Sequence, residues 1–243
     1  MPAKLGQHFL QDADIVKRMA EYAGVTKNDT VLEIGPGKGI LTEELVGRAG
    51  KVVAIEKDRI LAKMIEDKFP MTEVITGDAM KVAWPKFDKC VSNLPYEISS
   101  PVTFKLFESE WKLAVLMFQK EFAERFVSEA GSKHYSRLTV AVNYYCDAEI
   151  LEFVPKEKFV PRPKVNSAII RLTPKKPPFP ADDHFWATVT ALFRHKKKTV
   201  AAALKAAKYG KDAIGKVPQD LAKERVFMCE LEDLKRISDS LKQ

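Results

Sequence analysis

Residues 31–39 read Val-Leu-Glu-Ile-Gly-Pro-Gly-Lys-Gly, a short apolar run that leads into three alternating glycines. A buried strand that enters a tight glycine turn and then a helix is typical of the first unit of a doubly wound α/β sheet. Gly35 and Gly37 let the backbone turn sharply and let a ligand approach where a Cβ would otherwise stand. The stretch therefore predicts a Rossmann-like fold with a ligand at the carboxyl edge of its first strand.

The rest of the first two thirds of the chain continues this alternation of strands and helices. Apolar runs rich in β-branched residues predict buried strands at Thr30–Ile34, Val52–Ile55, Glu73–Ile75, Lys89–Ser92 and Leu113–Phe118. Apolar residues at helical spacing predict helices at Gly39–Arg48, Arg59–Phe69 and Ser99–Glu108. The alternation indicates parallel βαβ units in a mostly parallel sheet. We expect two later runs, Ala148–Phe153 and Ser167–Leu172, to form a C-terminal antiparallel hairpin.

A proline-rich segment marks a change of character along the chain. Half of the 14 prolines lie between Pro155 and Pro180, and the stretch Thr173–Pro180 cannot continue a helix or a central strand. Beyond it the apolar residues recur at helical spacing, first in a helix that contains Phe185, Val189 and Leu192. We predict an α/β domain at residues 1–174, a linker at 175–180 and a small all-helical domain at 181–243.

The composition restricts the class of protein. Of 243 residues, 46% are hydrophobic and 30% are charged, which indicates a globular chain with a sizeable core. No apolar run approaches the roughly 18 residues of a membrane span, and the N-terminus lacks the apolar core of a signal peptide, so we predict a cytoplasmic protein without a membrane. The three cysteines and four histidines show no ligand spacing, so no metal is expected. Nothing requires more than a monomer.

The positive charge is concentrated near the C-terminus. Residues 175–243 hold 15 basic and nine acidic residues, whereas residues 1–174 hold 25 and 24. This asymmetry favours an anionic partner, and nucleic acid is the commonest one, although a solvated lysine-rich surface is the alternative. The candidate contacts are Arg162 and Lys164 in the proline-rich segment and Arg194, Lys196, Lys197 and Lys198 in the basic run.

Three acidic residues, Glu33, Glu56 and Asp78, lie at or near the ends of predicted strands. Glu56 ends the second strand, where a carboxylate can accept hydrogen bonds from both ribose hydroxyls of a nucleoside, and Asp78 follows the third. Ile40 occupies the position where a dinucleotide motif needs its third glycine, and Glu33 would repel a pyrophosphate. A carboxylate instead tolerates the ammonium and sulfonium of S-adenosylmethionine. We therefore predict this cofactor over a nicotinamide dinucleotide or a P-loop nucleotide.

The fourth predicted strand ends in Asn93-Leu-Pro-Tyr96. Such residues also make ordinary turns. However, the Asn93 side-chain oxygen and the Leu94 carbonyl could accept both hydrogens of an exocyclic amine on a nucleobase, which favours a pyramidal nitrogen with a free lone pair. Pro95 would fix the backbone that carries this carbonyl, and Tyr96 could stack on the base. The segment predicts methyl transfer to an amino nitrogen by positioning, without a strong general base.

These motifs, together with the opening Gly6–Asp12 and the segment Phe159–Ser167, resemble the KsgA-type rRNA adenine N6-dimethyltransferases, with an archaeal-like character. The resemblance spans nearly the whole chain. It implies methyl transfer from S-adenosylmethionine to N6 of two adjacent adenines near the 3′ end of small-subunit (16S-type) rRNA. The product would be N6,N6-dimethyladenosine, formed within a pre-ribosomal small subunit during ribosome biogenesis.

The resemblance also implies roles for individual residues. The cofactor would contact His8, Leu10, Gly35, Gly37, Glu56, Asp78 and Asn93. The catalytic segment would be Asn93, Leu94, Pro95 and Tyr96, with Tyr96 and Phe159 enclosing the target adenine. Two alternatives remain open: an adenine N6-methyltransferase that acts on large-subunit rRNA or DNA, and a ribosome assembly factor whose binding role outweighs its catalysis.

Overall fold

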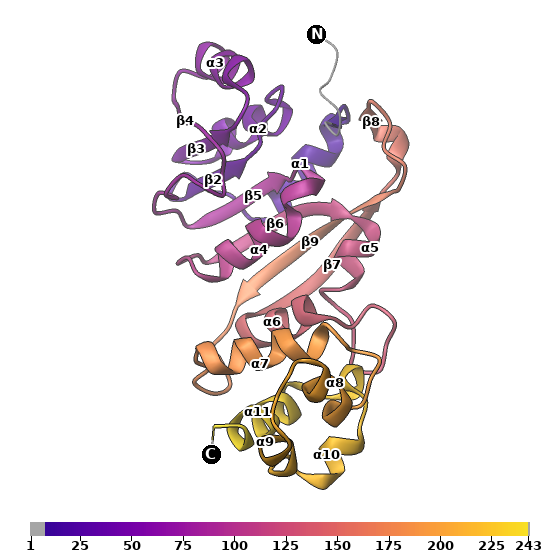
Figure 1. Cartoon of the computed structure of the whole chain (residues 1–243). Coiled ribbons are helices and arrows are strands. Elements are labelled where there is room, and N and C mark those ends of the chain that lie inside the picture. Colours follow the sequence, from indigo (N-terminus) through magenta and orange to yellow (C-terminus); the bar gives the residue numbers. More distant parts are fainter. Residues whose placement is uncertain (1–7, 243) are drawn as a thin grey trace. The chain divides into compact units, whose positions relative to one another are not determined.

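The computed structural model describes residues 8–242, so Gly6 and Gln7 of the opening motif lie outside the described residues. Residue contacts divide the chain into two compact units (Figure 1). Of the described residues, the first unit contains 8–123 and 148–174, and the second contains 124–147 and 175–242. Within this part of the chain no helix has the length and apolar character needed to cross a membrane.

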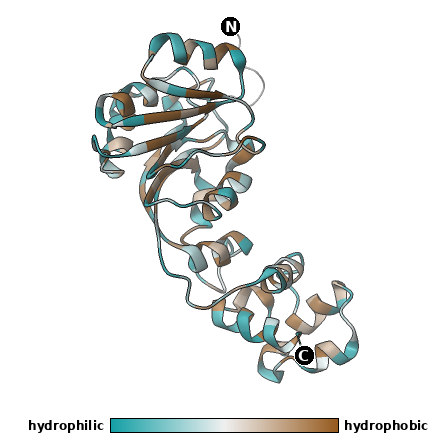
Figure 2. Ribbon diagram, turned by 90° about the vertical axis from the view of Figure 1, so that its left-hand side faces the viewer, coloured by the Kyte–Doolittle hydropathy of each residue, from teal (hydrophilic) through white to brown (hydrophobic). Residues whose placement is uncertain are grey.

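The first unit is built on a seven-stranded sheet with the order β4-β3-β2-β5-β6-β9-β7. Its strands are β2 (Thr30–Ile34), β3 (Lys51–Glu56), β4 (Thr72–Thr76), β5 (Lys89–Asn93), β6 (Leu113–Gln119), β7 (Cys146–Val154) and β9 (Ser167–Pro174). The strands from β4 to β6 are parallel, and β9 runs antiparallel to β6. The strands are largely hydrophobic (Figure 2), as expected for a sheet covered on both faces. The predicted strands and the mostly parallel doubly wound sheet are confirmed.

Helices follow most of the parallel strands of this sheet, but β4 leads to β5 without one. The predicted helices are confirmed as α2 (Ile40–Arg48), α3 (Arg59–Lys68) and α4 (Ser99–Phe107), and a short α5 (Lys120–Glu124) follows β6. A further helix, α1 (Ala13–Tyr22), was not predicted from the sequence, and it buries Ile15, Val16, Met19 and Ala20. The Asp12 carboxylate caps this helix by accepting hydrogen bonds from the first-turn amides of Asp14 and Ile15.

A second, two-stranded sheet joins the N-terminal segment to the proline-rich segment. Strand β1 (Phe9–Leu10) pairs antiparallel with β8 (Phe159–Val160), with Phe9 opposite Val160 and Leu10 opposite Phe159. A short 3-10 helix, η2 (Lys156–Lys158), directly precedes β8, and another, η1 (Tyr96–Ile98), lies between β5 and α4. Two-residue strands carry no periodicity, so sequence patterning cannot predict them.

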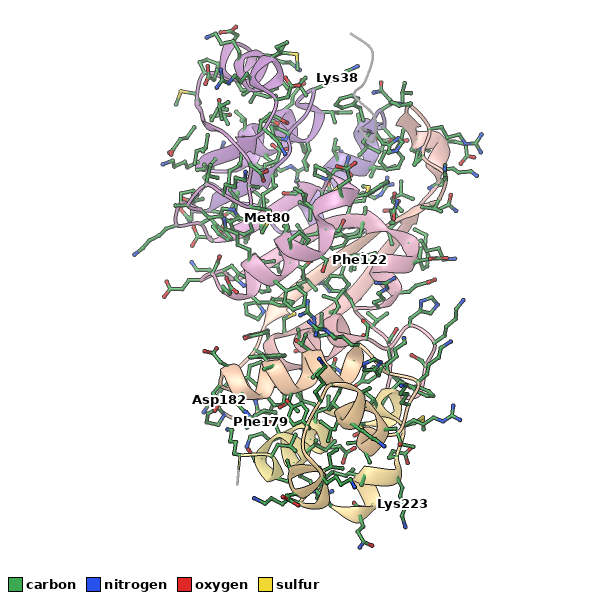
Figure 3. All side chains as sticks on the ribbon, in the orientation of Figure 1. Lys38, Met80, Phe122, Phe179, Asp182 and Lys223 are labelled. Atoms are coloured by element: carbon green, nitrogen blue, oxygen red, sulfur yellow. The ribbon has the colours of Figure 1, made fainter. Side chains whose placement is uncertain are left out.

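The second unit is helical, as predicted for the C-terminal part. It contains α6 (Arg137–Tyr145), α7 (Asp183–Phe193), α8 (Val200–Ala206), α9 (Lys211–Gly215), α10 (Gln219–Lys223), η3 (Val226–Met228) and α11 (Leu231–Ser240). Residues 124–147 group with these helices, whereas the sequence-based division placed them in the first domain. The reason is aromatic packing: the Tyr144 ring lies 5.4 Å from Phe179, labelled in Figure 3, and 6.3 Å from Phe185. The Tyr135 hydroxyl also donates to the Cys229 carbonyl at 2.8 Å.

Candidate active site

The glycine turn after β2 has the conformation that the sequence predicts. Gly35, Gly37 and Gly39 have φ values of +71°, +58° and +82°, in the region that favours glycine. A Cβ on Gly35 would lie 3.0 Å from the Pro95 side chain, and one on Gly37 would lie 3.1 Å from the Phe9 ring. These glycines therefore let two neighbouring segments, the N-terminal strand and the Asn93–Tyr96 segment, approach the turn closely.

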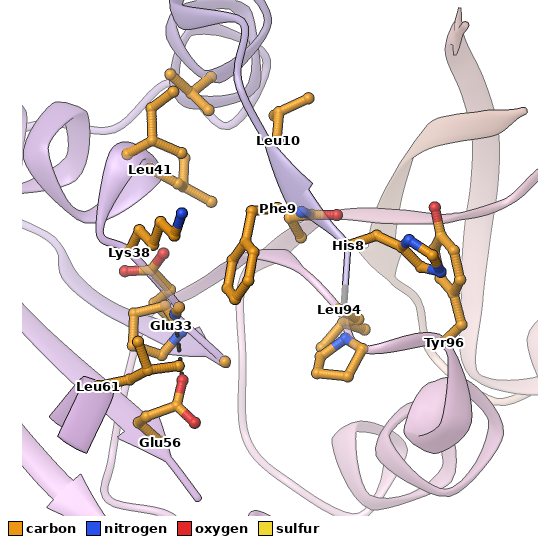
Figure 4. Close-up of a pocket in the computed structure, with 17 residues that line it drawn as sticks. His8, Phe9, Leu10, Glu33, Lys38, Leu41, Glu56, Leu61, Leu94 and Tyr96 are labelled. Carbon is orange, nitrogen blue, oxygen red and sulfur yellow. Dashed lines mark hydrogen bonds between the residues drawn. The ribbon is translucent and has the colours of Figure 1, made fainter. Parts of the chain in front are cut away.

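A pocket opens beside this turn (Figure 4). Its walls come from the turn, from the N-terminal segment, from the end of β3 and from the segment after β5. The predicted site residues that it brings together are His8, Leu10, Gly35, Gly37, Glu56, Asn93, Leu94, Pro95 and Tyr96. Residues separated by up to 88 positions in sequence thus line one cavity at the carboxyl ends of parallel strands, where ligands bind in such folds.

Glu56 is held in a fixed orientation at the wall of this pocket. Its side chain is only 6% exposed, and its two carboxylate oxygens accept hydrogen bonds from the backbone amides of Gly37 at 3.1 Å and Asp58 at 2.9 Å. Both amides belong to turns at the ends of β2 and β3. The carboxylate therefore joins the two turns and presents a preoriented acceptor to a ligand.

Glu33 is a second buried carboxyl group in the pocket wall. Its Oε2 accepts a hydrogen bond of 2.7 Å from the Thr42 hydroxyl, and its side chain is 2% exposed. Burial raises the pKa of Glu33 to about 8, and the nearby Glu56 carboxylate adds to this effect, while the Thr42 hydroxyl opposes it. A carboxyl in this environment gains from a cationic ligand, which would favour its ionised form.

Among the pocket residues that were not predicted from the sequence are Phe9 and Lys38. The Phe9 ring projects into the cavity between Leu94 and the side that carries Glu33 and Glu56 (Figure 4). The Lys38 ammonium lies 5.0 Å from the centroid of this ring, a cation–π distance. The sequence held one indication of this role, because Phe9 lies between His8 and Leu10, which were both predicted to contact the cofactor. The segment is too short for strand alternation to predict which of its side chains face the pocket.

The Asn93 segment begins where β5 is tied to β2. The Ser92 hydroxyl accepts a hydrogen bond of 2.8 Å from the Ile34 amide, which extends the contact between these strands beyond their backbone pairing. Among residues 8–242, no group bonds to the Asn93 side chain or to the Leu94 carbonyl. Pro95 has a φ of −57°. Both acceptors required for binding an amino group are thus available on a fixed backbone.

Tyr96 is restrained at both its ring and its hydroxyl. Its hydroxyl lies 2.7 Å from the Ser167 hydroxyl, and its ring centroid lies 5.8 Å from that of His8. His8 is itself held by a contact of 2.7 Å between its Nδ1 and the Pro161 carbonyl oxygen. Ser167 and the proline-rich segment therefore restrain two side chains of the pocket wall, Tyr96 and His8.

Comparison with known proteins identifies the family. A sequence model described as "Ribosomal RNA adenine dimethylase" matches residues 2–242. The chain belongs to this family. The predicted family resemblance and methyltransferase fold are confirmed.

Known relatives are similar to this dimethylase in sequence or in structure over nearly the whole chain. A "Probable ribosomal RNA small subunit methyltransferase A" of Thermococcus kodakarensis is 48% identical, over 98% of this chain and 89% of the relative. A crystal structure of a dimethyladenosine transferase from Plasmodium falciparum has a TM-score of 0.82 and 32% identity, over 94% and 95% of the two chains. The crystal structure of 23S rRNA methyltransferase ErmE has a TM-score of 0.70 and 29% identity, over 97% and 100%.

Two residues that the family resemblance assigned to the site lie apart from the pocket wall in this dimethylase. The Asp78 carboxylate accepts from the Met80 amide at 3.0 Å and pairs with Lys57 at 3.1 Å, which together hold its pKa below the usual value. Phe159 is 2% exposed and belongs to the hydrophobic core together with Leu10. Neither lines the pocket. Their contacts with cofactor and adenine stay predictions, and stacking on Phe159 requires its ring to become accessible.

The basic residues of the dimethylase differ in how free their charges are. Five of them are exposed: Arg162, Lys164, Arg194, Lys197 and Lys198. Of these five, only Arg162 has an ion-pair partner within the described part of the chain, and that partner is Glu157. Lys196 instead donates to the carbonyls of Lys133 at 3.0 Å and Tyr135 at 2.8 Å, and partial burial lowers its pKa. Its ammonium stabilises the loop before α6, so it is less available to RNA than its neighbours.

No metal centre is formed by the described side chains. Across residues 8–242, no group of three or more histidine, cysteine, aspartate or glutamate side chains is placed to hold an ion. All three cysteines are buried, and burial raises their pKa values to about 12, so they remain thiols.

Proposed function

We propose that this dimethylase transfers methyl groups from S-adenosylmethionine to N6 of two adjacent adenines near the 3′ end of small-subunit rRNA, giving N6,N6-dimethyladenosine. The observation that carries the proposal is the pair of unbonded acceptors at Asn93 and Leu94 in the wall of a pocket that also contains buried carboxylates. The small subunit as substrate is supported by the name of the 48% identical relative. We place the reaction on a pre-ribosomal small subunit in the cytoplasm, with the enzyme as a monomer.

The pocket residues fit this cofactor. Glu56 would accept hydrogen bonds from the ribose hydroxyls, because its oxygens are preoriented at the end of β3. The Glu33 carboxylate would neutralise the ammonium of the methionine part, while Gly35 and Gly37 admit that part close to the backbone. His8, Leu10 and Asn93 complete the wall, and Asp78 would approach the adenine ring. When bound, the cofactor supplies an electrophilic methyl group on a sulfonium centre.

The chain's own groups would prepare the target nitrogen. The Asn93 side-chain oxygen and the Leu94 carbonyl oxygen accept the two hydrogens of the adenine amino group, which withdraws its lone pair from the ring. The nitrogen then becomes pyramidal and directs that lone pair towards the methyl group. Transfer would form the N–C bond as the bond between the methyl carbon and sulfur breaks, with the electron pair of that bond left on the sulfur of S-adenosylhomocysteine. The methylated nitrogen would be strongly acidic, so one proton could pass to solvent without a dedicated base. Catalysis then depends on positioning and on preorganised acceptors.

Aromatic stacking would offset the cost of removing an adenine from its RNA helix. Tyr96, and Phe159 once accessible, would supply roughly 1–3 kcal/mol per stacked face. The RNA phosphates would be contacted by the exposed side chains of Arg162, Lys164, Arg194, Lys197 and Lys198. Recognition would rest on shape and charge, with Lys196 contributing indirectly through the loop that it stabilises.

A specific observation favours one second candidate, methylation of large-subunit rRNA: the TM-score of 0.70 to a 23S rRNA methyltransferase over nearly the whole chain. The deciding experiment incubates the protein with methyl-labelled S-adenosylmethionine and one of four substrates: small subunits lacking adenine dimethylation, free small-subunit rRNA, large subunits and duplex DNA. Mass mapping should find two adjacent dimethyladenosines in small subunits only. Label in the large subunit or in DNA would overturn the proposal.

The same experiment separates catalysis from an assembly role. Asn93→Ala should retain binding to small subunits and lose methyl transfer. If this variant retains transfer at the wild-type rate, the proposed acceptor role of Asn93 is wrong.

A further inference from the structure

The Tyr96 hydroxyl makes one contact that the methyl-transfer chemistry does not require. Its Oη lies 2.7 Å from the Ser167 Oγ, across 71 residues of sequence. Ser167 is fully buried and is the first residue of β9, where its backbone pairs with Gln119 of β6. A side chain on the sheet therefore reaches the far end of the Tyr96 ring.

We propose that Ser167 is a positioning residue: its hydroxyl holds the Tyr96 ring at the place where that ring stacks on the target adenine. This inference rests on the proposed function. A tyrosine side chain turns about two bonds, and Tyr96 stands in the short helix η1, directly after exposed Pro95. The Oη lies on the axis of the second bond, so a hydrogen bond there restrains rotation about the first bond and fixes the direction in which the ring extends. The plane of the ring is then restrained by its neighbours, such as His8.

The surroundings of Tyr96 support a role in anchoring rather than in proton transfer. Burial raises the pKa of the Tyr96 phenol, so the phenol stays protonated and neutral near pH 7. One neighbour of the ring is His8, at 5.8 Å with a tilt of 34°, and His8 is fixed by the Pro161 carbonyl. The ring is thus held by the sheet at its hydroxyl and flanked by an imidazole that is fixed independently.

The inference also accounts for two residue types. Phenylalanine at position 96 would stack equally well but could not be anchored by a hydroxyl. Alanine at position 167 would fill the buried position but leave the phenol without its partner. The hydroxyls at 96 and 167 should therefore act as one unit, so the loss of either should have the effect of losing both.

The test is a double-mutant cycle in methyl transfer to small subunits, with Ser167→Ala, Tyr96→Phe and the double variant. Loss of one neutral hydrogen bond should lower kcat by about two- to tenfold in each single variant. The double variant should fall no further than either single variant. The KM for small subunits and the affinity for S-adenosylhomocysteine should stay within about twofold, because the anchor touches neither RNA phosphates nor the cofactor.

Ser109→Ala is the matched control. Its hydroxyl donates to the Lys105 carbonyl at 2.9 Å within the same unit, away from the pocket wall. This variant should show wild-type kcat when all proteins are assayed below their unfolding temperatures. If Ser167→Ala does not fold, Tyr96→Phe alone still tests the loss of the anchor.

Two results would overturn the positioning role: wild-type kcat in Ser167→Ala or in Tyr96→Phe, or effects that multiply in the double variant. Failure of the proposed function looks different. In that case the wild-type protein labels no small-subunit adenine, or Asn93→Ala labels as well as wild type, and the positioning role falls with it.

Discussion

Glu33→Gln tests whether a buried carboxyl group in the pocket wall lowers the stability of the protein as the pH rises from about 4.5 to about 8. Burial raises the pKa of Glu33 from 4.5 to about 8, so the folded state holds a proton that the unfolded state has released. The free energy of unfolding therefore falls as the pH rises from about 4.5 to about 8 and changes no further above that. Between pH 5 and pH 8 this amounts to about 4 kcal/mol, taking 1.36 kcal/mol for each pH unit.

The assay is urea unfolding of wild type and Glu33→Gln at pH 5, 7 and 9. Glutamine keeps the shape and cannot ionise, so the variant should gain on wild type by a few kcal/mol between pH 5 and pH 9, with unchanged m-values. Glu110→Gln, at an exposed position, is the control and should show no such gain. A constant difference between Glu33→Gln and wild type at all three pH values would refute the assignment of a raised pKa to Glu33.

Three further predictions concern the cofactor, the glycine turn and the basic run. Glu56→Gln should weaken S-adenosylmethionine binding about tenfold in calorimetry, because it removes a charged acceptor fixed by two amides; unchanged affinity would exclude Glu56 from the site. Gly37→Ala should lower the unfolding free energy by about 1–2 kcal/mol in denaturant titrations, given its φ of +58° and the Phe9 ring 3.1 Å away, and a neutral effect would contradict this. Lys196→Met should lower the thermal stability and leave the affinity for small subunits almost unchanged, whereas Lys197→Met should lower the affinity and leave the stability almost unchanged. Identical behaviour of the two variants would contradict different roles for these lysines.

Sequence patterning predicted the parts of this fold that repeat a periodic signal. Helices follow β2, β3 and β5 along the chain, and the apolar runs of strands β2 to β6 are long enough to show burial. Patterning failed at β1 and β8, where pairing of Phe9 with Val160 depends on two segments about 150 residues apart. It also failed to assign residues 124–147 to the helical unit, because that grouping follows from aromatic contacts of Tyr144.

The candidate site shows the same division. Glycines, strand-end carboxylates and the Asn93–Tyr96 segment follow from local chemistry, and the structure brings them into one pocket. The direction in which a side chain points depends on tertiary contacts, which a sequence motif does not give. Phe159 is in the core, and Lys196 bonds to backbone carbonyls rather than facing solvent with Lys197. Equally, no motif suggested that Ser167 would reach the Tyr96 hydroxyl.

The proposed methyl transfer depends on two acceptors that bind the amino group of an adenine beside the cofactor. Methyl transfer by Asn93→Ala to undermethylated small subunits, mapped by mass spectrometry beside wild type, measures this most directly. At saturating S-adenosylmethionine, we expect two adjacent dimethyladenosines with wild type and about a hundredfold slower transfer with the variant. Transfer by the variant at the wild-type rate, or modification at any atom other than adenine N6, would contradict it.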